Sequence, residues 1–283
     1  MPIKNPISEL TKAAPLWLVG CGKMGGALLE GWLAKGLNPE AVIVIDPCGH
    51  ETCPKAIPAA NCYDNVLTIE GGISPYMIVL AIKPQNIDSI LNALKTVSLD
   101  NALVISIAAG TRIESMAKDL PKKTAIIRAM PNTPAAIKKG ITALVKNKHA
   151  KPDDEAMAGA MFDACGEVVW LEDESQFDAV TALSGSGPAY IFHLLEAMTE
   201  AGVELGLDAE IAEKFARQTI VGAAGLLEES TLSAAELREN VTSPNGTTEA
   251  ALNVLMADDG LVKLMTKAMT SARDRGVALS GKN

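Results

Sequence analysis

The sequence has few aromatic residues and no long apolar run. Hydrophobic residues make up 48% of the 283 residues but aromatic residues only 4%, so we expect a core of aliphatic side chains and methionine. No apolar run approaches the roughly 20 residues that a membrane-spanning helix needs, and the first residues contain no apolar segment of signal-peptide length. We therefore expect a cytoplasmic protein of about two domains, without a membrane partner.

The sequence also lacks an excess of positive charge and any paired cysteine motif. With 25 Lys and Arg against 34 Asp and Glu, the net charge is −9, which argues against nucleic acid as a partner. The five cysteines form no C-x-x-C pair, so we expect neither a metal site nor a disulfide framework. The thiols of Cys21, Cys48, Cys53, Cys62 and Cys165 are expected to be reduced.

A glycine-rich motif follows the first short apolar run and precedes a helical pattern. Residues 16–19 fit a strand, residues 20–25 (Gly-Cys-Gly-Lys-Met-Gly) fit G-x-G-x-x-G, and residues 27–34 have apolar residues at helical spacing. The first glycine permits a tight turn, the second lets the backbone approach a pyrophosphate, and the third lets the helix pack on the strand. The pattern favours dinucleotide binding over its alternative, a purely structural turn.

Strand and helix patterns alternate through the first part of the chain. Further strands are predicted at residues 41–45, 76–82, 103–107, 124–129, 141–145 and 167–171. This alternation is typical of an α/β fold, and we predict a doubly wound, mostly parallel Rossmann-type sheet over residues 15–172. The segment before it, residues 1–14, is expected to be a loose arm.

Beyond residue 171 the pattern changes to helices alone. Apolar residues recur at three- and four-residue spacing in residues 179–182, 190–205, 209–229, 234–240 and 248–275. We predict an all-α domain over residues 173–283. Its helices are rich in small residues and poor in aromatic ones, so we expect its core to be completed across a dimer interface.

Three predicted strands end in residues suited to ligand binding, because ligands in open α/β sheets bind at the carboxyl ends of the strands. Asp46 ends the second strand and suits a hydrogen bond to an adenosine ribose, although Asp-Pro also begins turns. Lys83 follows the third strand, where a solvated surface lysine is the alternative. Residues 108–110 follow the fourth strand, and their small size would let a ligand lie against the backbone.

Two loops stand out in the helical part of the chain. Residues 184–190 are Ser-Gly-Ser-Gly-Pro-Ala-Tyr, residues 240–248 are Asn-Val-Thr-Ser-Pro-Asn-Gly-Thr-Thr, and each loop leads into a predicted helix. The hydroxyls and free N–H groups of the second loop suit a carboxylate. The alternative for both is an ordinary helix-capping loop.

Taken together, the motifs resemble those of the pyrroline-5-carboxylate reductases. In chain order they are VGCGKMG at 19–25, AIKP at 81–84, SIAAG at 106–110, RAMPNTP at 128–134, SGSGPAY at 184–190 and SPNGTT at 243–248. The resemblance implies an NAD(P)H-dependent reduction of 1-pyrroline-5-carboxylate to L-proline. It also implies a Rossmann domain joined to a helical dimerisation domain, in a homodimer at least and often in a ring of five dimers.

The same resemblance implies roles for individual residues. The cofactor's pyrophosphate would lie at Val19, Gly20, Cys21, Gly22, Lys23 and Met24. Its adenosine ribose would lie at Asp46 and Asn65. Its nicotinamide half would lie at Ala81, Ile82, Lys83, Pro84, Ile107, Ala108 and Ala109. Asn240 would reach the cofactor from the helical domain. The substrate would contact Glu174, Ser243, Thr247 and Thr248, with its carboxylate on the backbone of the two threonines and its ring nitrogen at the Thr248 hydroxyl.

Two residues of the SPNGTT region depart from the family's pattern. Asn245 stands where glycine is common, and asparagine tolerates a positive φ better than most residues. Glu249 stands where an apolar residue is usual, directly after the two threonines. It adds negative charge near the expected carboxylate site.

Asp46 bears on the choice between NADH and NADPH. Its carboxylate can accept hydrogen bonds from the ribose hydroxyls of NADH but would face like charge from the 2′-phosphate of NADPH. No lysine or arginine lies between Asp46 and Lys55 to offset that repulsion. The sequence therefore predicts a preference for NADH.

Two other functions fit parts of the sequence. A β-hydroxyacid-type dehydrogenase also joins a Rossmann domain to helices, but it needs a lysine on the first long helix, and residues 190–205 contain none. A non-enzymatic NAD(P)-binding sensor would share the glycine motif. It would bind cofactor without oxidising it.

Overall fold

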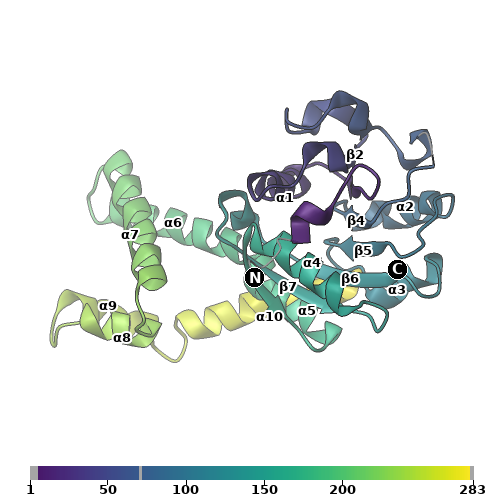
Figure 1. The fold of residues 1–283 in the computed structure, drawn as a ribbon. Helices are drawn as coiled ribbons and strands as arrows, with labels where there is room; N and C mark the ends of the chain where they lie inside the picture. Colours follow the sequence, from purple (N-terminus) through teal and green to yellow (C-terminus); the bar gives the residue numbers. More distant parts are fainter. Residues whose placement is uncertain (1–5, 70–71, 281–283) are drawn as a thin grey trace. The chain divides into compact units, whose positions relative to one another are not determined.

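The computed structural model describes residues 6–69 and 72–280 of the chain (Figure 1). The chain divides into two compact units, the first made of residues 1–185 and 272–283 and the second of residues 186–271. The last helix, α10 (Leu261–Ser280), therefore begins in the second unit and ends in the first. Among the described residues, no helix is both long and apolar enough to cross a membrane.

The first unit is built around a mostly parallel sheet. Its strands are β1 (Leu16–Val19), β2 (Val42–Ile45), β3 (Cys62–Tyr63), β4 (Met77–Leu80), β5 (Leu103–Ser106), β6 (Ala125–Met130), β7 (Gly140–Lys146) and β8 (Gly166–Trp170). Their order across the sheet is β3-β2-β1-β4-β5-β6-β7-β8. The first six strands in this order, from β3 through β2 and β1 to β6, run parallel to one another. Strand β7 is antiparallel to β6, and β8 is parallel to β7. The predicted α/β sheet is confirmed.

Helices cover both faces of this sheet, as expected when central strands are buried on both sides. In β1, Leu16 and Leu18 belong to one buried cluster while Trp17 and Val19 belong to the other, because successive side chains of a strand point to opposite faces. The first cluster includes residues of α1 (Lys23–Ala34) and α4 (Pro152–Asp163), and the second includes residues of α2 (Ile87–Leu94) and α3 (Ile113–Asp119).

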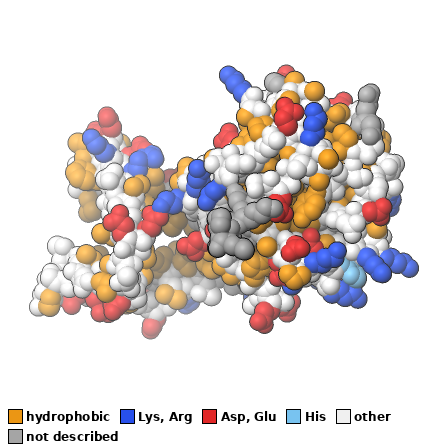
Figure 2. Space-filling model, in the orientation of Figure 1, with side chains coloured by type: hydrophobic (Ala, Val, Ile, Leu, Met, Phe, Trp, Pro, Cys, Tyr) orange, Lys and Arg blue, Asp and Glu red, His pale blue; other side chains and the backbone are white. Residues whose placement is uncertain are grey.

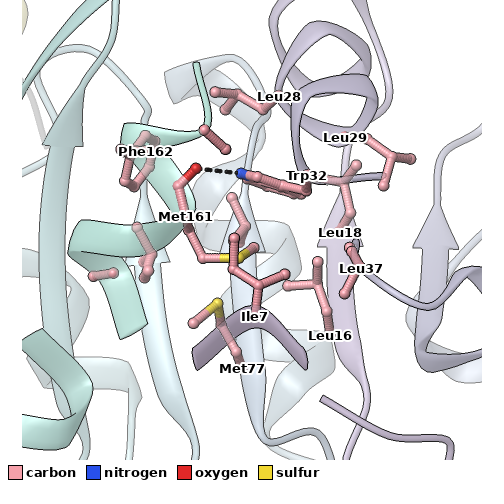
Figure 3. Packing of buried hydrophobic residues seen from close by; sticks show 14 of the residues in the cluster. Ile7, Leu16, Leu18, Leu28, Leu29, Trp32, Leu37, Met77, Met161 and Phe162 are labelled. Carbon is pink, nitrogen blue, oxygen red and sulfur yellow. Dashed lines mark hydrogen bonds between the residues drawn. The ribbon is translucent and has the colours of Figure 1, made fainter. Parts of the chain in front are cut away.

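A buried hydrogen bond joins α1 to α4 (Figure 3). The indole Nε1 of Trp32 donates to the carbonyl oxygen of Met161 at 2.8 Å, which gives a buried tryptophan the partner it needs. Gly31 permits the close approach, because a Cβ at that position would stand 2.4 Å from Sγ of Cys165. This packing anchors α1, whose first turn is part of the candidate site.

The segment before β1 is packed rather than loose. Residues 6–9 form a 3-10 turn, and Ile7 and Leu10 are only 1% and 2% exposed, within the same cluster as Trp32 (Figure 3). Burying two such side chains stabilises the fold by about 3–6 kcal/mol. Over residues 6–14 the structure thus differs from the loose arm that was expected for residues 1–14. Two isolated apolar residues give no periodic pattern, and residues 1–5 lie outside the described part of the chain.

The polypeptide leaves the sheet through a short helical segment. A 3-10 turn (Glu174–Gln176), α5 (Phe177–Val180) and one π-helical turn (Thr181–Gly185) follow β8. Phe177 is fully buried in the first unit, so this unit extends to residue 185 instead of ending at residue 172 as the sequence suggested. The end of α10 packs on α5, where a Cβ on Gly276 would stand 3.1 Å from Oδ1 of Asp178.

The second unit is entirely helical among its described residues, as predicted. It contains α6 (Gly187–Glu204), α7 (Ala209–Glu229), α8 (Ala234–Asn240), α9 (Thr247–Leu255) and the beginning of α10. The prediction of a single helix over residues 248–275 is wrong, because the helical conformation is interrupted between α9 and α10. This interruption contains Gly260, where a Cβ would stand 2.3 Å from the carbonyl oxygen of Leu255.

The second unit leaves many large apolar side chains exposed. Within the described residues, α6, α8 and α9 contain no buried side chain, and the buried residues of α7 are two alanines. Phe192, Phe215 and Val254 are 64%, 67% and 72% exposed, and Figure 2 shows hydrophobic side chains on the surface of this unit. Apolar exposure on this scale is typical of a surface that another chain covers.

Candidate active site

The three glycines of the motif have different surroundings. Gly20 has a positive φ of 94°, and a Cβ there would stand 2.4 Å from the carbonyl oxygen of Ala81. A Cβ on Gly25 would stand 2.2 Å from the carbonyl oxygen of Gly20, so the fold itself requires both glycines. Gly22 instead faces open space, with no atom within 4 Å of its Cβ position. Its missing side chain therefore leaves room for a ligand.

The glycine turn places the N-terminus of α1 beside the open space at Gly22. Gly22 is the N-cap residue, and no side chain caps the helix. The first helical bond runs from the N–H of Gly26 to the carbonyl oxygen of Gly22 at 2.8 Å, so the N–H groups of Lys23, Met24 and Gly25 precede it. Such free donors, together with the positive end of the helix dipole, favour an anion.

Asp46 lies at the carboxyl end of β2, against the glycine turn. Its Oδ2 accepts a hydrogen bond from the N–H of Cys21 at 2.7 Å, and its Oδ1 accepts one from the N–H of Cys48 at 2.9 Å. The carboxylate thus stabilises both the glycine turn and the turn after β2. Each oxygen retains a further lone pair, so the group can still accept bonds from ribose hydroxyls.

Two clefts meet at the glycine turn. The first, of about 670 Å³, is lined by Cys21, Gly22, Lys23, Met24, Gly26, Ala27, Glu30, Thr133 and Ala136. The second, of about 390 Å³, is lined by Gly22, Lys23, Met24, Ala81, Ile82, Lys83, Ile107, Ala108, Ala109, Met130, Pro131, Asn132, Thr133 and Gly185. We call it the nicotinamide cleft, because it collects all of the residues that the sequence predicted for that half of the cofactor except Pro84.

One wall of the nicotinamide cleft was missed in the assignment of site residues. It consists of the loop from Met130 to Thr133 and of Gly185, where a Cβ would stand 2.6 Å from Cε of Met130. Asn132 fixes this wall: its Oδ1 accepts from the N–H of Ile141 at 3.0 Å, and its Nδ2 donates to Oγ of Ser184 at 3.2 Å. The position of the loop at a strand's carboxyl end was the signal available in the sequence.

Glu174, expected at the substrate, makes a structural ion pair. Its Oε1 accepts from Nη1 of Arg128 at 2.8 Å and from the N–H of Ile113 at 3.0 Å. Arg128 is only 3% exposed, and its guanidinium lies 4.4 Å from the centroid of the Phe177 ring. The carboxylate therefore holds the start of α3 and the segment after β8 on β6. A substrate role for Glu174 stays a prediction.

Several predicted cofactor residues line neither cleft, namely Gly20, Asp46 and Asn240 together with Val19, Pro84 and Asn65. Val19 is the buried last residue of β1, and Pro84 begins the 3-10 turn before α2. Asn65 is exposed and accepts a hydrogen bond from the N–H of Leu67 at 2.9 Å. Asn65 follows β3, which is parallel to its neighbour β2. Asn65 and Asp46 therefore both lie at the carboxyl ends of the strands. Their contacts with a cofactor stay predictions.

Three thiols lie together beside the glycine turn. Sγ of Cys62 is 3.3 Å from Sγ of Cys53, and both side chains are partly buried. Burial raises the pKa of the Cys21 thiol to about 11 and also raises the pKa of Cys53. None of the five cysteines forms a disulfide, and no group of His, Cys, Asp and Glu among the described residues has the arrangement of a metal site.

The loop predicted for the substrate lies in the second unit. Asn240 ends α8, and a turn follows in which the N–H of Gly246 donates to the carbonyl oxygen of Ser243 at 3.0 Å. Thr247 and Thr248 are the first two residues of α9, whose N-cap Gly246 provides no side-chain cap. Ser243, Thr247 and Thr248 are thus brought together at one helix N-terminus.

Comparison with known proteins decides the family. A model described as pyrroline-5-carboxylate reductase dimerisation matches residues 174–279, and one described as NADP oxidoreductase coenzyme F420-dependent matches residues 16–110. A pyrroline-5-carboxylate reductase from Pseudomonas aeruginosa is 39% identical over 263 residues, which cover 93% of this chain and 95% of that protein. The chain belongs to the pyrroline-5-carboxylate reductase family.

Further pyrroline-5-carboxylate reductases agree in sequence and in fold. The Synechocystis protein is 41% identical over 243 residues, covering 85% of this chain and 89% of that protein. The structure of the Coxiella burnetii protein matches with a TM-score of 0.82 and 35% identity, covering 95% of this chain and 99% of that one. The Plasmodium falciparum protein, solved with NADP bound, matches with a TM-score of 0.80 and 27% identity over the same shares of the two chains.

The described residues fit the dinucleotide that this reductase family uses. The open space at Gly22, the uncapped start of α1 and the two clefts that meet there suit an extended ligand with a central pyrophosphate. The family and the joining of a Rossmann-type part to a helical dimerisation part, both predicted from the sequence, are confirmed.

Proposed function

We propose that this chain reduces 1-pyrroline-5-carboxylate to L-proline with a reduced nicotinamide dinucleotide. Its membership of the family, over 93% of its length, supports the reaction. The structural observation that carries the proposal is the pair of clefts meeting at Gly22, Lys23 and Met24, at the carboxyl ends of the parallel strands. That edge of the sheet is where such folds bind dinucleotides.

In this proposal the glycine turn binds the pyrophosphate. The N–H groups at the start of α1 donate hydrogen bonds, Lys23 adds positive charge, and Gly22 leaves space for the phosphates. Asp46 and Asn65 bind the adenosine ribose, and Asn240 is a further cofactor residue. The nicotinamide half lies against Ala81, Ile82, Lys83, Pro84, Ile107, Ala108 and Ala109, most of which line the nicotinamide cleft.

The start of α9 binds the substrate. The N–H groups of Thr247 and Thr248 hold its carboxylate, with Ser243 and Glu174 as further substrate residues. When bound, the reduced nicotinamide supplies a hydride for the imine carbon. The Thr248 hydroxyl forms a hydrogen bond with the ring nitrogen, which carries the proton in the product. Because a protonated imine is already electrophilic, the chain does not need a strong general acid.

NADH is the preferred cofactor in this proposal. The support is the carboxylate of Asp46, which lies 2.7 Å from the N–H of Cys21 and so at the side of the glycine turn where the adenosine ribose is expected. A 2′-phosphate at that ribose would meet like charge. The Plasmodium falciparum relative was solved with NADP bound, so this preference would distinguish the chain from that relative.

The chain functions as a homodimer at least. The exposed apolar side chains of α6, α7 and α9 and the match of residues 174–279 to a dimerisation model support this assembly. A ring of five dimers, as the family resemblance implies, would be its complete form.

A cytoplasmic location completes the proposal. The absence of a disulfide at any of the five cysteines agrees with a reducing compartment, in which disulfides are rare. Fractionation of the cells that produce the protein would check the location, and recovery outside the cytoplasm would contradict it.

One assay tests the proposed reaction. Purified protein is mixed with 1-pyrroline-5-carboxylate and NADH or NADPH, the loss of cofactor absorbance is followed, and the product is identified by mass spectrometry. We expect cofactor consumption that depends on the substrate and matches the L-proline formed. Cofactor binding without consumption would indicate a sensor and would contradict the proposal.

A further inference from the structure

The turn before α9 is held by the side chain of Glu249. Its Oε2 accepts a hydrogen bond from the N–H of Asn245 at 2.7 Å. Asn245 has a positive φ of 58°, which the turn needs at this position and which asparagine adopts more readily than most residues. The two residues that depart from the family's pattern are therefore hydrogen-bond partners.

The same turn shapes the N-terminus of α9. A Cβ on Gly246 would stand 2.4 Å from Oγ of Ser243, so the turn closes tightly just before the helix. The first helical bond runs from the N–H of Ala250 to the carbonyl oxygen of Gly246 at 3.2 Å. The N–H groups of Thr247 and Thr248 precede that bond and point from the helix end that the proposed function gives to the substrate's carboxylate.

Glu249 adds a negative charge to this helix end. The residue is half-buried, and within the described part of the chain no lysine or arginine forms an ion pair with it. A carboxylate bound at Thr247 and Thr248 would share the first helical turn with it. Two like charges so close repel each other, and the repulsion weakens binding of the mobile one.

We propose that Glu249 both builds the carboxylate site and limits its affinity. Its hydrogen bond to Asn245 holds the turn, while its charge weakens binding of the substrate and of the product. This inference rests on the proposed function, because it takes the start of α9 as the substrate site. The carboxylate of the ligand is unchanged by the reaction, so the charge acts equally on substrate, transition state and product. Glu249 should therefore affect binding constants and leave kcat almost unchanged.

The test separates the charge of Glu249 from its hydrogen bond. Glu249→Gln retains an oxygen that accepts from the N–H of Asn245 but removes the charge, whereas Glu249→Ala removes both. Glu236→Gln is the matched control, because Oε2 of Glu236 accepts from the N–H of Ser233 at 2.7 Å at the start of a different helix. The measurements are kcat, the KM for 1-pyrroline-5-carboxylate, and the Kd of L-proline by calorimetry, at low and high salt.

We expect Glu249→Gln to lower the KM and the Kd of L-proline by the same factor, about threefold to tenfold, with little change in kcat. High salt should shrink that factor, since it screens charge. Glu249→Ala should bind both ligands less tightly than Glu249→Gln, because its turn is no longer held. The control should match the unmodified chain.

Unchanged KM and Kd in Glu249→Gln would overturn the inference while leaving the proposed function intact. A Glu249→Gln variant that binds more weakly, like Glu249→Ala, would also overturn it, because the hydrogen bond alone would then explain the residue. Absence of any turnover in the unmodified chain would overturn the proposed function and this inference together.

Discussion

At the scale of single residues, Asp46 has a structural role that the structure shows and a ligand-binding role that we propose. It accepts hydrogen bonds from the N–H of Cys21, in the glycine turn, and from the N–H of Cys48, after β2. In the proposed function, removing its charge should affect binding of the adenosine ribose, whereas removing its hydrogen bonds should loosen the turn. Substitutions that separate these effects are informative about cofactor choice.

The unmodified chain should prefer NADH over NADPH by about tenfold or more in kcat/KM, since a charged contact is worth on the order of 1.5–3 kcal/mol. Asp46→Ser should narrow this ratio, chiefly by improving the use of NADPH. Asp46→Asn, which keeps an acceptor oxygen and removes the charge, serves as its control and should narrow the ratio too. Steady-state kinetics with both cofactors measure the ratio. Better use of NADPH by the unmodified chain, or a ratio unchanged in both variants, would show that Asp46 points away from the cofactor.

Thr248 is the other residue whose role is open to a direct test. If its hydroxyl supports the ring nitrogen during hydride arrival, Thr248→Ala should lower kcat by about tenfold or more, equivalent to about 1.4 kcal/mol. Thr248→Ser retains the hydroxyl and should recover most of the loss. Stopped-flow or steady-state turnover measures the effect. If Thr248→Ala keeps the original kcat, Thr248 has only a structural role at the start of α9.

At the scale of elements, the strand, turn and helix from β1 to α1 separate two uses of glycine. Gly25 is required by contacts within the chain, whereas Gly22 is not. Gly22 has a φ of −70° and a ψ of −164°, an extended conformation that any residue adopts. A side chain at Gly22 should therefore be tolerated by the fold and rejected by the ligand.

We expect Gly22→Val to keep its unfolding temperature within a few degrees of the original while its Kd for NADH rises by about tenfold or more. Gly25→Ala should instead lose stability, by about 1–3 kcal/mol or more, because its Cβ would overlap a backbone carbonyl. Thermal unfolding and NADH fluorescence titration measure the two effects. Gly159→Ala on α4 is a control away from both clefts. Tight NADH binding by a folded Gly22→Val variant would exclude the glycine turn as the pyrophosphate site.

The elements with strong local patterns were predictable from the sequence. Central strands such as β1 and β4 are buried on both faces, so they appear as unbroken apolar runs, and α7 and α8 show clear helical spacing. Elements defined by distant contacts were not predictable. β3 has only two residues, and Ile7 and Leu10 are buried by helices that lie far along the sequence.

The candidate site follows the same division. The residues of the glycine turn and of residues 81–83 and 107–109 are consecutive in the chain, so motifs located them, and the structure places them on two clefts that meet. The bond between Asn132 and Ser184 joins residues 52 positions apart, and the pair of Arg128 and Glu174 joins residues 46 apart. No local pattern shows such contacts, so the sequence did not indicate that residues 130–133 and Gly185, which lie in two separate motifs, form one wall of a cleft.

At the scale of the whole molecule, the second unit has too little buried surface to stand alone. The alanines of α7 are its only buried hydrophobic residues within the described ranges, while Phe192, Phe215 and Val254 are exposed. Burying side chains of this size stabilises by about 1.5–3 kcal/mol each, which favours association strongly. From the exposed apolar surface of the second unit we therefore predict that the chain associates with further copies of itself.

Light scattering at micromolar concentration should give at least twice the chain mass of 29.6 kDa. A mass of ten chains would extend the dimer to a ring of five. Phe215→Asp, which puts a charge on the exposed apolar surface, should weaken assembly, whereas Lys214→Asp beside it serves as a control for the added charge. A stable and active monomer would contradict this part of the account.

The central claim is that this chain delivers hydride from a nicotinamide to the imine carbon of 1-pyrroline-5-carboxylate. It is tested most directly with NADH deuterated at C4 of the nicotinamide, prepared separately in each of its two stereochemical forms. The account predicts that one form yields L-proline with a single deuterium on the ring carbon that was the imine carbon, detected by mass spectrometry and NMR. L-proline without deuterium from both forms, or no L-proline at all, would contradict the account.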